Sequence, residues 1–162
     1  MVCERRYQVG EQWYNLRPDA LAEYCVGSQQ VRFWLEWDRG TMNVRDLAVK
    51  FTSYASYIAS REWARERSML PVLICVAPDI AQERCMQCVA QARLAETSGL
   101  VLWTTTEVLL NEHGSMAPIW LPGMPKRSQT AQTGSSLRQC AFAKAGERIR
   151  CLSANVIAHD TV

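Results

Sequence analysis

Five side chains in the first third of the chain have the types and spacing that phosphodiester chemistry needs. Asp19 lies near the start of one strand-like run, Glu36 and Asp38 lie on one face of the next, and Lys50 and Tyr54 stand one helical turn apart in the segment that follows. Carboxylates from neighbouring strands form an oxygen-rich site for Mg²⁺ or Mn²⁺, and a lysine beside them stabilises developing negative charge or orients a water. Spacing alone favours the simpler alternative that all five are ordinary surface residues.

The elements that carry these side chains begin with a predicted β-hairpin, formed by residues 17–24 and 31–37. Alternation along the second run separates two faces. One face holds four apolar residues, Val31, Phe33, Leu35 and Trp37, which we expect in the core. Trp34 shares the other face with Glu36 and Asp38, where a nucleic-acid base could stack on its ring.

Downstream of the hairpin, strands alternate with helices. Apolar residues at spacings of three and four predict an amphipathic helix over 43–65, with Thr41 or Asn43 as its N-cap. Continuous apolar runs at 70–77 and 100–105 predict buried strands, and helices are expected over 80–98 and 106–113. The order ββαβαβα predicts an α/β fold with a mixed sheet flanked by helices.

Length and charge predict one folded domain followed by a tail. A chain of 162 residues with 48% hydrophobic and 21% charged residues is long enough for a single core. Residues 1–122 hold 12 Lys and Arg against 14 Asp and Glu, whereas residues 123–162 hold 6 against 2. Because the second segment also has no sustained periodicity, we expect a domain over 1–122 and a basic, disordered tail over 123–162.

The chain shows no signal for export or for a membrane. Its apolar runs are shorter than the roughly 18 residues that cross a bilayer, and no apolar stretch follows the N-terminal arginines. The cytoplasm is therefore the expected location. Seven cysteines, an odd number in a chain without an export signal, are expected to be free thiols.

Three motifs together resemble the replication-relaxation family of plasmids and integrative elements. They are Leu16-Arg-Pro-Asp-Ala20, then Trp34-Leu-Glu-Trp-Asp-Arg-Gly-Thr41, then Lys50 with Tyr54; segments at 103–110 and 118–120 continue the similarity. The resemblance covers roughly residues 13–122, and its middle motif is the most specific. It implies a replication-related function on DNA, with DNA and the element's replication or conjugation proteins as partners. The family core in turn resembles the restriction-endonuclease-like fold of PD-(D/E)xK nucleases.

Carried over residue by residue, the resemblance implies a metal-dependent endonuclease centre. Pro18-Asp19 matches the PD position and Glu36 the (D/E) position, while Asp38 stands where the motif lysine belongs. Lys50 would be that lysine relocated to the helix. Asp19, Glu36 and Asp38 would then hold Mg²⁺ or Mn²⁺, and Tyr54 would position the substrate.

Two departures from the family pattern leave an alternative open. A carboxylate at the lysine position favours a non-catalytic DNA- or protein-binding module that keeps the nuclease-like fold. Family members commonly begin with a winged-helix region, whereas about 15 residues precede the first motif here, so we expect the C-terminal portion of the family pattern. In either case Arg39, at the strand end, and Arg45, at the helix start, are candidate phosphate contacts.

Overall fold

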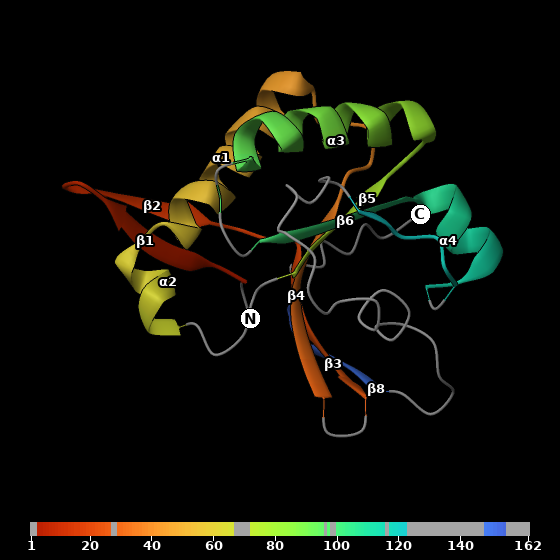
Figure 1. The fold of residues 1–162 in the computed structure, drawn as a ribbon, viewed down its shortest axis with the longest axis horizontal. Coiled ribbons are helices and arrows are strands. Elements are labelled where there is room, and N and C mark those ends of the chain that lie inside the picture. The colour runs from red at the N-terminus through yellow and green to blue at the C-terminus, as the bar shows by residue number, and fades with distance from the viewer. Residues whose placement is uncertain are drawn as a thin grey trace, which may run out of the picture.

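A mixed β-sheet forms the centre of the fold. The computed structural model describes residues 3–26, 29–66, 72–95, 97, 100–115, 117–122 and 148–154. The sheet has six strands in the order β7-β6-β5-β4-β3-β8 (Figure 1), with β4, β5 and β6 parallel and the other pairs antiparallel. Their bounds are β3 (Ala20–Val26), β4 (Gln29–Trp37), β5 (Val72–Ala77), β6 (Val101–Thr106), β7 (Leu121–Pro122) and β8 (Arg148–Ala154).

Two long helices, α1 (Val44–Ile58) and α3 (Ile80–Leu94), lie side by side over one face of this sheet (Figure 1). Each belongs to a crossover between parallel strands, because parallel neighbours cannot be joined by a tight turn. The short helices are α2 (Arg61–Glu66) and α4 (Glu107–His113). The predicted mixed α/β architecture is confirmed, and the predicted alternation of strands and helices is found between β3 and α4.

The helix predicted over 43–65 is two helices, so that prediction is wrong in its extent. Helix α1 ends at Ile58, and Ser60 then accepts a hydrogen bond from the Trp63 backbone N–H (3.3 Å) at the start of α2. The Ser60 hydroxyl also donates to the Tyr57 carbonyl (2.6 Å). A serine that offers these local bonds competes with a continuous helix, which explains the break.

The start of α1 follows the prediction. The Asn43 side chain accepts hydrogen bonds from the backbone N–H groups of Arg45 (2.9 Å) and Asp46 (3.1 Å). The Asp46 carboxylate in turn accepts from the Asn43 N–H, which completes a capping box. This cap sets where α1 begins, and therefore which of its residues face β4.

A β-hairpin that was not expected from the sequence precedes the sheet. Its strands are β1 (Arg5–Val9) and β2 (Gln12–Leu16), with Gly10 at φ +60° in the turn. Its inner face carries Tyr7 and Leu16, both buried, and the Tyr7 ring centroid lies 5.7 Å from that of Tyr57 on α1. The hairpin is thereby fastened to the helices, while its tip extends away from the sheet (Figure 1).

Most of the tail expected over 123–162 falls outside the described residues. Within it, Arg148–Ala154 form β8, which pairs antiparallel with β3, so this part of the segment has regular structure. Three of the cysteines, Cys75, Cys85 and Cys88, are free thiols. No helix among the described residues has the length and apolar character to span a membrane.

Candidate functional site

Glu36 lies at the centre of a buried polar cluster between β4 and α1. Its side chain is 3% exposed. The Lys50 ammonium contacts one carboxylate oxygen, and the Tyr54 hydroxyl donates a hydrogen bond to the other. Lys50 and Tyr54 are four residues apart on α1 and therefore project from one helix face toward the same strand position. The predicted convergence of these three side chains is found in the structure.

Burial and charge shift the pKa values of all three groups. Burial raises the pKa of Glu36 to about 7, although the Lys50 ammonium and the Tyr54 hydroxyl oppose this change. Burial also lowers the pKa of Lys50, but the Glu36 carboxylate outweighs that effect and the net direction is upward. Burial and the adjacent Glu36 raise the pKa of Tyr54 well above its usual value. Near neutral pH, Lys50 is thus charged, Tyr54 is neutral and Glu36 is close to its midpoint.

This raised pKa makes stability depend on pH. Because the folded protein holds the Glu36 proton more tightly than the unfolded chain, whose carboxyl has a pKa near 4.5, protonation stabilises the fold. The stabilisation is fully present below about pH 4.5 and is lost as the pH rises through about 7, a change of about 3 kcal/mol. We therefore expect urea unfolding to show that the free energy of unfolding of the native protein, relative to that of Glu36→Gln, falls by about 3 kcal/mol as the pH rises through this range. A difference that stays constant with pH would contradict the buried, protonatable Glu36.

Asp19 approaches the cluster from the segment before β3. Its carboxylate accepts a hydrogen bond from the Trp37 backbone N–H (2.7 Å), and its own N–H donates to the Leu35 carbonyl (3.0 Å). The charge of Asp19 contributes to raising the pKa values of Glu36 and Lys50, so the two carboxylates are electrostatically coupled. Asp19 thus both fixes the end of β4 and adds negative charge beside the cluster.

Asp38, the third predicted ligand, organises a loop. One of its oxygens accepts hydrogen bonds from the N–H groups of Gly40 (2.9 Å), Thr41 (3.1 Å) and Met42 (3.3 Å). The other accepts from the Gln82 side-chain amide (2.6 Å), which reaches across from α3. Gly40 has φ +79°, a conformation that favours glycine, and allows the chain to turn around the carboxylate. The geometry supports a role for Asp38 in organising this loop rather than the predicted role as a metal ligand.

The two tryptophans of β4 have the opposite burial to that predicted: Trp34 is buried and Trp37 is exposed. Trp34 is 4% exposed and its ring lies among those of Tyr54, Tyr57 and Trp63, with centroids 5.3, 5.7 and 5.8 Å away. It is therefore not available to stack on a base, which corrects the expectation for Trp34. Trp37, expected in the core, is 39% exposed. The physical reason is that α1 covers the strand face that carries Trp34 and Glu36.

An open groove lies beside the cluster, between the base of the hairpin and α1. It has a volume of about 360 Å³, and its lining includes Arg17, Arg45 and Lys50 against a single acid, Asp46. Lys50, whose side chain is 26% exposed, belongs both to this groove and to the Glu36 cluster. Arg45 is exposed on the first turn of α1, as expected for a phosphate contact. Arg39 is also exposed but does not line this groove.

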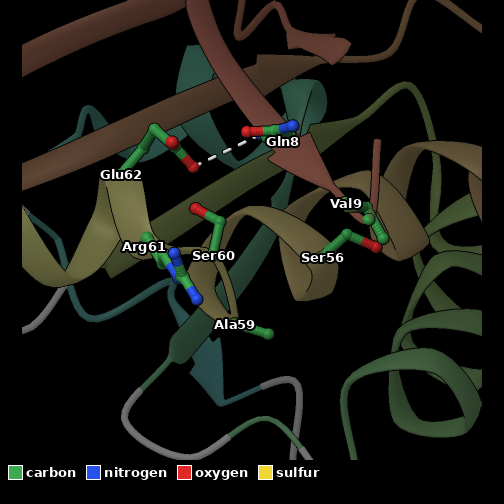
Figure 2. A pocket seen from close by; sticks show the side chains of 8 residues that line it. Gln8, Val9, Ser56, Ala59, Ser60, Arg61 and Glu62 are labelled. Atoms are coloured by element: carbon green, nitrogen blue, oxygen red, sulfur yellow. Dashed lines mark hydrogen bonds between the residues drawn. The ribbon is translucent and has the colours of Figure 1, made fainter. Parts of the chain in front are cut away.

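A second cavity of about 490 Å³ lies between the hairpin turn and the junction of α1 with α2 (Figure 2). The Gln8 backbone N–H donates a hydrogen bond to the Glu62 carboxylate there (3.3 Å), and Ser56, Ser60 and Arg61 complete the polar lining. The Glu62 pKa is lowered by backbone hydrogen bonds, its own and that from Gln8. None of the predicted site residues lines this cavity, so we place the candidate site at the basic groove.

The cluster as arranged does not fit a three-carboxylate metal centre. No group of three or more His, Cys, Asp or Glu side chains suited to a metal ion occurs in the described part of the chain. Both Glu36 oxygens are in contact with Lys50 and Tyr54, and both Asp38 oxygens accept hydrogen bonds elsewhere. Mg²⁺ needs carboxylate oxygens that are free to enter its octahedral shell.

Two residues of this region were not identified from the sequence. Arg17 was expected only as part of a family motif, yet it lines the groove and also pairs with Glu4 (3.3 Å). Gln82 bridges the Asp38 carboxylate and the Met42 carbonyl (2.9 Å) and so connects α3 to the loop before α1. Because Arg17 is two residues from Asp19, its position in the sequence was a signal that it lies near the predicted site. No local pattern marks Gln82, because its partners are 40 or more residues away.

Taken together, the fold and the site define a mixed α/β domain with a buried carboxylate–lysine–tyrosine cluster under a basic groove. Residues 3–73 match the family model described as replication-relaxation, which confirms the resemblance over this segment. The match includes β1 to β4, α1, α2 and all eight predicted site residues, but not the segments at 103–110 and 118–120. No curated protein and no solved structure matches the chain.

Proposed function

We propose that this chain binds DNA during replication of a plasmid or other mobile element, acting in the cytoplasm as a non-catalytic module on a restriction-endonuclease-like fold. The observation that carries the proposal is the open groove lined by Arg17, Arg45 and Lys50. The lining contains three cations and one acid. Arg17 and Lys50 also pair with Glu4 and Glu36, whereas Arg45 is exposed on α1, and such cations suit the phosphate backbone, which dominates the affinity of most DNA-binding proteins. The family match to residues 3–73 supports the connection with replication.

One observation favours a second candidate, the Mg²⁺- or Mn²⁺-dependent endonuclease that the resemblance implies. Lys50 reaches Glu36 from the helix, as a relocated motif lysine would, and Asp19 is electrostatically coupled to both. This activity stays a prediction, because it requires Glu36 to exchange its present contacts for a metal. The non-catalytic module needs no such rearrangement and is therefore the function that the geometry supports best.

Charge reversal at Arg45 tests the DNA-binding proposal. Arg45→Glu places an acid in the first turn of α1, where negative charge suits the helix dipole, so the fold should persist. Fluorescence anisotropy with a labelled duplex should show an affinity loss on the order of tenfold at low salt, and the salt dependence should decrease by about one phosphate contact. Arg84→Glu is the matched control, since Arg84 is an exposed α3 residue outside the groove. Equal binding by both variants would refute the groove as the DNA site.

A second experiment on the native protein tests whether it is an endonuclease. Calorimetric titration with Mn²⁺ and incubation with supercoiled plasmid should show neither metal binding nor nicking if both Glu36 oxygens keep their contacts. Glu36→Gln serves as the comparison because it retains the shape of the side chain. Metal binding and nicking by the native protein, with loss of both in Glu36→Gln, would establish the endonuclease in place of the non-catalytic module.

A further inference from the structure

The outward face of the β1–β2 hairpin carries an exposed tryptophan with an arginine over its ring. Arg6 pairs in register with Asn15, and both lie on the same side of the hairpin as Trp13, opposite to Tyr7 and Leu16. Trp13 is 50% exposed, and the Arg6 guanidinium carbon lies 4.6 Å from its ring centroid. An indole is large and apolar, and leaving half of it in water forgoes the stabilisation that burial would provide. The inner face already fastens the hairpin, so Trp13 is not required there.

This face is continuous with the basic groove. Asn15 lines the groove, and it is two residues from Trp13 on β2, a distance of about 7 Å along a strand. Arg17 follows Asn15 at the same interval. Along this surface, the Trp13 ring with the Arg6 guanidinium over it is therefore followed by the Asn15 amide and then by the cations of the basic groove.

We propose that Trp13 stacks an unpaired base of a single DNA strand whose backbone lies in the basic groove. The proposal rests on the DNA-binding function above and specifies its substrate class. Paired bases present only their edges to a protein, whereas an unpaired base offers its π-face to an aromatic ring. Arg6 strengthens the platform through its positive charge and its planar group. Single strands are recognised by this combination of a stacking residue and a cationic track.

The test compares binding to a labelled oligothymidine of about 20 nucleotides and to a duplex of the same length, at one fixed salt concentration. Trp13→Ala should weaken single-strand binding by about 5- to 100-fold and leave duplex binding unchanged. Trp13→Phe should restore most of the loss because it keeps an aromatic face. Trp37→Ala removes another exposed tryptophan, on β4, and should bind both probes like the native protein. Matching thermal unfolding curves show that each variant is folded.

The outcomes separate this inference from the proposed function. Native-like single-strand binding by Trp13→Ala, with weakened binding by Arg45→Glu, overturns the stacking platform and leaves DNA binding standing. Equal losses for both probes overturn the preference for single strands. If the native protein binds neither probe, the DNA-binding function itself fails. Loss of a replication protein's association in Trp13→Ala, without any DNA effect, assigns the face to protein contact and also overturns the inference.

Discussion

Replacing Trp34 by alanine is expected to lower the free energy of unfolding by about 3–5 kcal/mol, a large part of the stability of a domain of this size. The side chain is 4% exposed and touches three other aromatic rings, from α1 and α2. Its removal leaves a cavity that these rings can fill only by leaving their packed positions. Urea denaturation followed by circular dichroism measures the loss.

Trp37→Ala is the control for this experiment, because Trp37 lies on the same strand but is 39% exposed. Its loss should be about 1 kcal/mol or less. A Trp34→Ala protein with native stability and reduced affinity for single-stranded DNA would contradict the packing role. That result would support the base-stacking role predicted from the sequence.

The second large effect is expected at Asp38. Asp38→Ala removes the acceptor of three backbone N–H groups and of the Gln82 amide, and should lower the free energy of unfolding by about 2–4 kcal/mol. The loop from Gly40 to Met42 sets the entry into α1, so its loosening should also shift Lys50 relative to Glu36. Urea unfolding measures the first effect, and loss of the pH dependence assigned to Glu36 reports the second.

Asp38→Asn distinguishes the contribution of the hydrogen bonds from the loop N–H groups from that of the hydrogen bond from Gln82 on α3. Its remaining oxygen can still accept from the three N–H groups, while its amide replaces only the oxygen that faces Gln82. The stability loss should therefore be less than half of that in Asp38→Ala. Equal losses in the two variants would show that the Gln82 contact, rather than the loop, holds Asp38 in place.

Periodicity predicted which side chains of β4 share a face but not which face is buried. The alternation that groups Trp34 with Glu36 and Asp38 is present in the structure. The error lay in assigning carboxylates to solvent. Glu36 is buried because Lys50 and Tyr54 arrive from another element to satisfy it, and Asp38 because a loop folds around it. A single strand contains no information about such partners.

The elements that were not predicted from the sequence are a largely exposed hairpin and a strand that pairs with a distant segment. The β1–β2 hairpin has exposed residues at most of its positions, and its apolar alternation, Tyr7 with Val9 and Tyr14 with Leu16, is limited to two residues in each strand, which is a weak signal for a strand. Strand β8 is defined by its pairing with β3, well over 100 residues earlier in the chain. By contrast, the buried strands β5 and β6 and the Asn43 cap were predicted because their signals are local.

The bridge made by Gln82 connects the segment that matches the family model to a helix outside that segment. The family match ends at residue 73, after the second residue of β5 and before α3 begins. Yet Gln82 holds the Asp38 loop from α3, and Met86, Ala90 and Leu94 of the same helix belong to the core that encloses Trp34 and Phe51. The matched segment carries the candidate site residues but not all of the elements that bury them. The part of the chain that matches the family model is therefore smaller than the part that packs together, and substitutions in α3 can alter the site although they lie outside the matched segment.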